Sequence, residues 1–171
     1  MKKTLLAMAA VAALYTTGAM AQSMPAGVYV GLGGDWAQSA AKGANSTGAA
    51  NLKAGYDFNK YLATELDVSA GFANGNQRAN TATMLNVLAG VPVDLAGFKV
   101  KPYAMVGTGY DFAYAHGSNN INTVPAYNVG GGLEYDINKN VSVDVRYTYV
   151  DGYNKNSTSA NVVGMSVNYK F

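Results

Sequence analysis

The chain has 171 residues, of which 13% are charged, and it contains no cysteine. It holds 12 Lys and Arg against 10 Asp and Glu, and without Lys2 and Lys3 ten of each remain. This balance gives no argument for nucleic-acid binding, and the missing cysteine excludes a disulfide framework. The charged fraction is low for a water-exposed surface, which is usually about a quarter charged or more.

The first 21 residues have the parts of a secretory signal peptide. Lys2 and Lys3 are basic, Leu5–Leu14 is an apolar run, and Ala19-Met20-Ala21 is a small-x-small cleavage site. The apolar run is too short for a membrane-spanning helix. We therefore expect residues 1–21 to be a cleaved signal peptide and residues 22–171 to be one exported domain, with a buried N-terminal helix as the weaker alternative.

Eight later segments alternate apolar and polar residues with a period of two, as strands with one apolar face do. In chain order they are Val28–Trp36, Asn51–Phe58, Leu62–Phe72, Leu85–Val93, Phe98–Phe112, Tyr127–Ile137, Val141–Tyr149 and Asn161–Phe171. No charged residue falls on an apolar face when the strands are aligned in this way. A charged side chain that faced lipid at the middle of the bilayer would cost about 2–4 kcal/mol. The pattern predicts strands whose apolar faces contact lipid.

Strands of about 9–11 residues are long enough to cross the hydrocarbon of a membrane. Because backbone polar groups in lipid need internal partners, such a sheet must close. We predict an all-β fold: an eight-stranded up-and-down antiparallel transmembrane β-barrel, monomeric, in a Gram-negative outer membrane. The short connections Asn59-Lys60, Asp94–Gly97 and Asn138–Asn140 then face the periplasm, and longer loops at 37–48, 73–82, 113–123 and 151–160 face outward.

Aromatic residues gather at both ends of the predicted strands. Toward the loop end are Trp36, Phe72, Tyr110, Phe112, Tyr127, Tyr147 and Tyr149, and toward the turn end are Tyr56, Phe58, Phe98, Tyr135, Tyr169 and Phe171. They predict two girdles at the membrane interfaces. Pro102 has no amide hydrogen for a ladder, so we expect a bulge or a local break near the turn end of its strand.

The segments Gly27–Gly34, Val100–Tyr110, Tyr135–Tyr149 and Val167–Phe171 carry a resemblance that spans the whole exported part of the chain. They resemble the small eight-stranded outer membrane barrels: the opacity-related surface proteins, the OmpX-like proteins and the transmembrane domain of OmpA-like proteins. The resemblance implies outer membrane lipids, including lipopolysaccharide, as partners. It also implies insertion by the barrel assembly machinery, with Tyr169 and Phe171 in the terminal recognition signal.

Two features of those relatives are not expected here. OmpA-like proteins often add a peptidoglycan-binding domain, whereas Phe171 is the last residue of this sequence. The opacity adhesins carry long variable loops, and the loops predicted here are shorter, which argues against adhesion to a specific receptor.

Seven charged residues face the predicted lumen: Lys53, Glu65, Asp67, Lys101, Glu134, Asp144 and Arg146. Three-residue turns would place Lys53 opposite Glu65 or Asp67, and Glu134 opposite Asp144 and diagonal to Arg146, as lumen salt bridges. One interpretation is a gate in which Lys53, Glu65, Lys101, Glu134 and Arg146 exchange partners and admit ions, as the OmpA-like resemblance suggests. The other is a polar plug that satisfies itself, which we favour because an eight-stranded interior leaves little room.

We identify no catalytic residue, metal site or cofactor in the sequence. The only histidine, His116, has Ser118 two residues later in a loop. Lipid A deacylases of this architecture carry a His-x-Ser pair near the end of the seventh strand, where this chain has Arg146–Asp151 without either residue. A base also needs a nucleophile within reach and a group that orients it. No Cys or His cluster is present for a transition metal.

We therefore expect a non-catalytic role in membrane structure and at the cell surface. Loops would contact host or cell-surface molecules, and no nucleic acid. Lys42 and Arg78 are isolated loop cations that either touch lipopolysaccharide phosphates or, more simply, are solvated. A narrow pore is the alternative function, and an enzyme that modifies lipid A is the weaker third.

Overall fold

The computed structural model describes residues 27–39, 46–72, 80–95, 97–114, 121–153 and 159–171. The predicted signal peptide, Lys42, Arg78, His116 and Ser118 lie outside the described residues. Within those ranges there is no helix with the length and hydropathy needed to cross a membrane. The strands are β1 (Gly27–Ser39), β2 (Ser46–Asp57), β3 (Leu62–Gly71), β4 (Asn80–Gly90), β5 (Val93–Leu95), β6 (Phe98–Tyr114), β7 (Ile121–Asp136), β8 (Val141–Gly152) and β9 (Ala160–Lys170).

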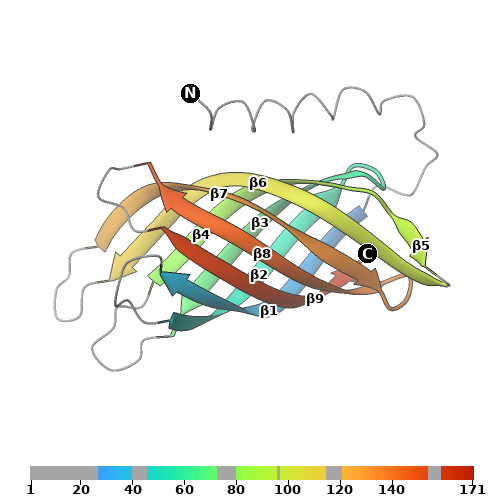
Figure 1. Ribbon diagram of the computed structural model, residues 1–171, viewed down its shortest axis with the longest axis horizontal. Helices are drawn as coiled ribbons and strands as arrows, with labels where there is room; N and C mark the ends of the chain where they lie inside the picture. The colour runs from blue at the N-terminus through green and yellow to red at the C-terminus, as the bar shows by residue number, and fades with distance from the viewer. Residues whose placement is uncertain (1–26, 40–45, 73–79, 96, 115–120, 154–158) are drawn as a thin grey trace.

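Each strand pairs antiparallel with its neighbour in sequence, except that β4 pairs with both β3 and β6. The first strand, β1, pairs with the last, β9, from Tyr29↔Lys170 to Ser39↔Ala160. The β1–β9 and β4–β6 pairings close the sheet, so eight strands form the barrel. β5 is an extension that pairs only with β6 (Figure 1). The predicted all-β, eight-stranded up-and-down antiparallel barrel is confirmed.

The barrel has a polar interior and an apolar exterior. Leu32, Leu52 and Met165 are 67%, 58% and 57% exposed, whereas Lys53 and Glu65 are 0% and 1% exposed. A protein dissolved in water buries its apolar side chains and leaves charges outside. This arrangement is stable only if hydrocarbon surrounds the exterior, because lipid solvates the apolar side chains and the closed ladder satisfies the backbone.

Exposed aromatic rings pair at both ends of the barrel. Near the turn end, Tyr169 and Phe171 form a T-shaped pair with ring centroids 5.1 Å apart, and Tyr56 and Phe58 form another at 5.2 Å. Near the loop end, the rings of Tyr110 and Phe112 lie 6.4 Å apart. The rings lie where the sequence predicted two girdles.

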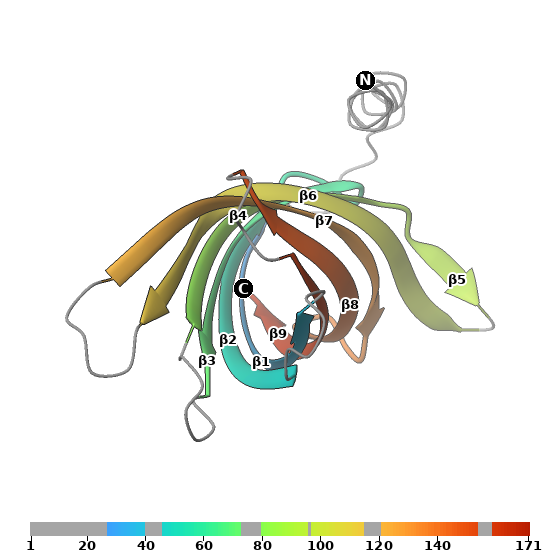
Figure 2. The same cartoon turned by 60° about the vertical axis from the view of Figure 1, so that its left-hand side comes forward.

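The predicted fourth strand, Leu85–Val93, is divided in the structure. β4 ends at Gly90 opposite Tyr103, and β5 begins at Val93 opposite Val100, so the register continues unchanged across the gap. At the gap the Val91 amide donates to the Pro102 carbonyl at 3.0 Å, but Pro102 has no amide hydrogen to return. The break expected beside Pro102 therefore falls on the neighbouring strand. Figure 2 shows β5 and the adjoining end of β6 standing away from the other strands.

Several strands run further into the predicted long loops than alternation suggested. The pairs Trp36↔Gly48, Ala37↔Thr47 and Gln38↔Ser46 extend the β1–β2 ladder into the segment 37–48. β6 likewise continues to Tyr114, and β7 begins at Ile121. At the β1–β2 end the physical reason is that Gln38, Ser46 and Thr47 place polar residues on both faces, so the alternation of apolar and polar residues ends although the backbone ladder continues.

Candidate functional site

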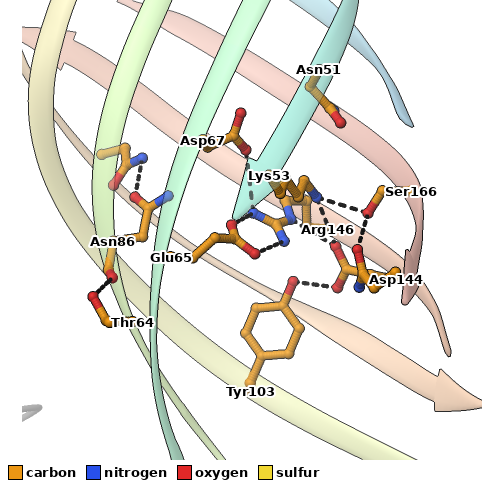
Figure 3. Close-up of polar contacts among 12 residues, drawn as sticks. Asn51, Lys53, Thr64, Glu65, Asp67, Asn86, Tyr103, Asp144, Arg146 and Ser166 are labelled. Carbon is orange, nitrogen blue, oxygen red and sulfur yellow. Dashed lines mark hydrogen bonds and ion pairs between the residues drawn. The ribbon is translucent and has the colours of Figure 1, made fainter. Parts of the chain in front are cut away.

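An ion-paired layer crosses the middle of the lumen, and Arg146 is its centre. Arg146 projects from β8, and Nη1 and Nη2 donate to Oε1 and Oε2 of Glu65 on β3 at 2.7 and 3.2 Å. The Asp67 carboxylate lies 3.6 Å from Nη1. Because the two planar groups match, this two-point contact fixes orientation as well as charge. Figure 3 shows the layer.

Asp144 joins the two cations of the layer. Its Oδ1 accepts from Arg146 Nε at 2.8 Å and from Lys53 Nζ at 3.1 Å. Lys53 also donates to Ser166 Oγ on β9 at 2.9 Å. Lys53, Glu65, Asp144 and Arg146 are all at most 5% exposed. Buried charges need partners, and every charged group in this set has at least one.

Two lumen tyrosines complete the layer. The Tyr29 hydroxyl donates to Glu65 Oε2 at 2.9 Å, and the Tyr103 hydroxyl donates to Asp144 Oδ2. The sequence prediction missed both residues as members of the layer. Tyr29 lies opposite Gly55 and Tyr103 opposite Gly132, and an added Cβ at either glycine would meet the ring. A tyrosine on the lumen face opposite a glycine on the next strand is the sequence pattern that would have predicted these two residues. The pattern can be recognised only when the register between the two strands is known.

A second, more exposed group of charges lies toward the turn end. Lys170 Nζ is 2.7 Å from Glu134 Oε1 and 2.9 Å from Asp136 Oδ1. Lys101 Nζ is 3.6 Å from Asp57 Oδ1 and 4.0 Å from Glu134 Oε2. The seven predicted lumen charges therefore divide into two groups: Lys53, Glu65, Asp67, Asp144 and Arg146 in the layer, and Lys101 and Glu134 at the turn end.

Strand register places Lys53 opposite Asp67 and Glu134 opposite Asp144, as the turn lengths allowed. The salt bridges predicted for Lys53 with Glu65 or Asp67, and for Glu134 with Arg146, are not the ones that form among the described residues. Lys53 instead reaches Asp144 on β8, and Glu134 bonds Lys170 rather than Arg146. Lys53 and Asp144 lie on β2 and β8, which are not neighbours in the sheet, so closure of the barrel adds partners across the lumen that strand register alone does not give.

Two cavities lie on either side of the layer, and Arg146 lines both. The one toward the loop end has a volume of about 210 Å³, and the one toward the turn end about 10 Å³. The second volume is near the minimum for one water molecule, about 10–15 Å³. Among the described residues, no group of three or more His, Cys, Asp and Glu is placed to hold a metal ion.

The sequence from residue 5 to residue 171 matches the model of the outer membrane protein beta-barrel domain family. The chain belongs to this family. That membership, the closed barrel and its apolar exterior make the protein a transmembrane barrel of the Gram-negative outer membrane. A comparison with curated proteins gave no match.

Solved structures with this fold come from several bacteria. Neisserial surface protein A matches with a TM-score of 0.65 and 18% identity, over 84% of this chain and 97% of that one. The N-terminal barrel of Pseudomonas aeruginosa OprF matches with a TM-score of 0.60 and 15% identity, over 86% and 100%. Ail of Yersinia pestis, solved in complex with the heparin analogue sucrose octasulfate, matches at 0.53 and 16%, over 86% and 100%. At these identities the similarity establishes the fold.

Proposed function

We propose that this protein is a structural outer membrane barrel with a closed lumen, which acts through its lipid-facing wall and its loop surface and catalyses no reaction. The observation that carries the proposal is the ion-paired layer. It ties β2, β3, β6, β8 and β9 together across the interior through the contacts of Lys53, Glu65, Tyr103, Asp144 and Arg146.

The free-energy cost of breaking buried ion pairs favours a layer that stays closed. Removing one partner from a buried ion pair typically costs about 3–5 kcal/mol, because the other charge stays buried without compensation. Arg146 contacts three carboxylates, those of Glu65, Asp67 and Asp144. Opening a path for ions would require several of these contacts to break together. The cavity of about 10 Å³ on the turn side leaves little room for a solute beneath them.

A narrow pore is the second candidate, and one contact favours it. Asp67 lies 3.6 Å from Arg146 Nη1, beyond the 2.7 Å contact with Glu65. A guanidinium that moved from Glu65 toward Asp67 would keep a partner while the layer rearranged. This exchange is the mechanism by which the lumen would open.

Conductance in planar bilayers separates the two candidates. We would record wild type, Arg146→Ala and, as a control outside the layer, Lys170→Ala. The structural proposal predicts a silent wild type, and stepwise openings of the wild type would overturn it. A gate predicts openings once Arg146 is removed, so silence of both wild type and Arg146→Ala would end the gate hypothesis.

We propose that the loops present a basic surface to anionic groups. Lys42, Arg78 and Lys155 lie in the sequence between strands, where the segments 40–45, 73–79, 115–120 and 154–158 contain no Asp or Glu. The neighbour Ail was solved with a sulfated heparin analogue. Binding of intact cells to immobilised heparin, with and without the protein, tests this surface. Equal binding by the deletion strain, or by a strain with all three cations changed to Gln, would contradict it.

We also propose that Tyr169 and Phe171 form the signal for the barrel assembly machinery. The two residues are 47% and 76% exposed, and their rings form a T-shaped pair at the barrel's end. Phe171→Ala should lower the amount of folded barrel in cells while the purified protein refolds in detergent as well as wild type does. An equal loss of folded barrel in cells and in detergent would mean that Phe171 stabilises the barrel and is not part of an assembly signal.

A further inference from the structure

The turn between β2 and β3 holds a lysine at its tip. Asn59 Oδ1 accepts hydrogen bonds from the amides of Tyr61 and Leu62 at 2.8 and 3.0 Å. This side-chain cap reverses the chain around Lys60, whose Nζ lies 4.9 Å from the centre of the Tyr61 ring. Phe58 continues the apolar side of β2 and is 52% exposed, two residues before the lysine. Its amide donates to the Leu62 carbonyl at 2.9 Å.

The turn between β7 and β8 repeats this construction. Asn138 Oδ1 accepts hydrogen bonds from the amides of Asn140 and Val141 at 2.8 and 2.9 Å. Ile137 continues the apolar side of β7, is 55% exposed, and donates to the Val141 carbonyl at 2.9 Å. Lys139 therefore has the same place in this turn as the lysine of the first turn. One arrangement of an exposed apolar residue, a capping asparagine and a lysine thus occurs twice.

The two turns lie on opposite sides of the barrel. In the closed order of strands, β2, β1, β9 and β8 separate them on one side, and β3, β4, β6 and β7 on the other. Short turns of outer membrane barrels face the periplasm. Lys60 and Lys139, here called the turn lysines, are therefore at the periplasmic rim, each next to the last apolar residue of the lipid-facing wall.

The carboxylates at this end of the barrel pair with other cations. Asp57 lies 3.6 Å from Lys101 Nζ. Glu134 and Asp136 lie 2.7 and 2.9 Å from Lys170 Nζ. Within the described ranges, no ion pair joins an Asp or Glu to either of the turn lysines. Two positive charges at the rim are thus left without a partner in the protein.

An exposed apolar side chain beside an ammonium group fits the boundary between acyl chains and headgroups. The apolar side chain stays in the lipid there, and the lysine extends its charge to the headgroups. An ammonium without a partner attracts a headgroup with net negative charge, whereas a zwitterionic headgroup brings its own cation. The surface therefore selects for lipid charge.

We propose that the turn lysines bind the headgroups of anionic phospholipids in the periplasmic leaflet, one on each side of the barrel. Two such contacts on opposite sides hold the barrel at a fixed depth and tilt. The proposal rests on the lipid-facing wall and does not depend on whether the lumen conducts ions.

Electron spin resonance of spin-labelled lipids tests the site. The protein is refolded into phosphatidylcholine vesicles, and the motionally restricted fraction is measured for spin-labelled phosphatidylglycerol and phosphatidylcholine. The readout is the ratio of the two association constants. The variants are Lys60→Gln and Lys139→Gln, singly and together, and circular dichroism verifies that each is folded. Lys99→Gln is the matched control: Lys99 is exposed at the same end, but it lies opposite Asp94, on the side of the β5–β6 ribbon away from the lipid-facing residues.

We expect wild type and Lys99→Gln to prefer phosphatidylglycerol by the same ratio, about two- to fivefold, because one lysine near a charged surface is worth up to about fivefold. Each single variant should lower the ratio, and the double variant should lose most of the preference. In 1 M NaCl, where the screening length falls to about 3 Å, the preference of wild type should disappear.

A ratio of one in wild type would overturn the proposal, and so would a double variant that keeps the ratio of wild type. A loss in Lys99→Gln as large as in the single turn variants would mean that net charge alone attracts the lipid. A preference that survives 1 M NaCl would show that headgroup charge is not what the rim recognises. None of these outcomes changes the conductance expected of the lumen, so failure of this proposal is distinguishable from failure of the closed barrel.

Discussion

Arg146 and Glu65 are 81 positions apart in the chain and meet across the lumen through two hydrogen bonds of 2.7 and 3.2 Å. Glu65 is 1% exposed and Arg146 is 5% exposed, so water does not screen the pair. The contact joins β3 to β8, strands that are not neighbours in the sheet. It therefore braces the barrel wall from inside in a way that the backbone ladder does not.

Glu65→Gln tests this brace. The change should lower the free energy of unfolding by about 3 kcal/mol, at the low end for a broken buried pair because Asp144 still contacts Arg146. Urea unfolding in lipid vesicles measures the loss. Asp136→Asn is the control: its carboxylate is 34% exposed and pairs with Lys170 near the turn end, so we expect about 0–1 kcal/mol. Equal losses in the two variants would contradict a special role for the layer.

Gly107→Ala tests how closely the lumen is packed. An added Cβ would lie 2.6 Å from the Leu85 carbonyl oxygen and 2.6 Å from Asn128 Oδ1. Backbone cannot move away without breaking the ladder, so we expect a loss of about 1–3 kcal/mol in the same unfolding assay. Gly34→Ala is the control, because the nearest atom to its Cβ would be the Ala49 oxygen at 3.5 Å. A loss in Gly34→Ala as large as in Gly107→Ala would remove the packing explanation.

Leu32→Arg tests the lipid-facing wall. Leu32 is at the middle of β1 and is 67% exposed, so an arginine there would face the hydrocarbon. We expect about 2–4 kcal/mol of destabilisation for a charge at mid-depth and about 0–1 kcal/mol near an interface. Val163→Arg, close to the loop end of β9, supplies the interface case. If Leu32→Arg unfolds at the same urea concentration as wild type, this face does not contact lipid.

Pro102→Ala tests the cause of the gap between β4 and β5. The new amide at position 102 would face the Val91 carbonyl, since Val91 already donates to the Pro102 oxygen at 3.0 Å. A new hydrogen bond adds about 0.5–1.5 kcal/mol, and loss of proline rigidity removes about 0.4–1 kcal/mol, so total stability is a poor measure. Hydrogen exchange is the better one, and we expect the amide at position 102 to be protected. Exchange at the rate of an unpaired amide would mean that the missing amide of Pro102 is not the cause of the gap.

Most of the barrel wall could be predicted from residue order. Val163, Met165 and Val167 alternate with Gly164, Ser166 and Asn168, and the structure exposes the first set while it buries the second. Alternation is a local property of an extended chain, so one sequence is enough to detect it. Its limits are equally local: where both faces are polar, as at Gln38 opposite Ser46, the ladder continues without a sequence signal.

The sequence alone determined which residues face lipid and which face the lumen, because successive side chains of a strand point to opposite faces of the sheet whatever lies beside it. It also predicted the neighbours Glu134↔Asp144 and limited the residue opposite Lys53 to Glu65 or Asp67, of which the structure selects Asp67. Only the tertiary structure decided the partners of the lumen charges, the contacts of Tyr29 and Tyr103, and the cavity on the loop side of the ion-paired layer. Those contacts span the lumen, and the distance across it is set by how eight strands close and tilt together, which no local spacing along the chain encodes.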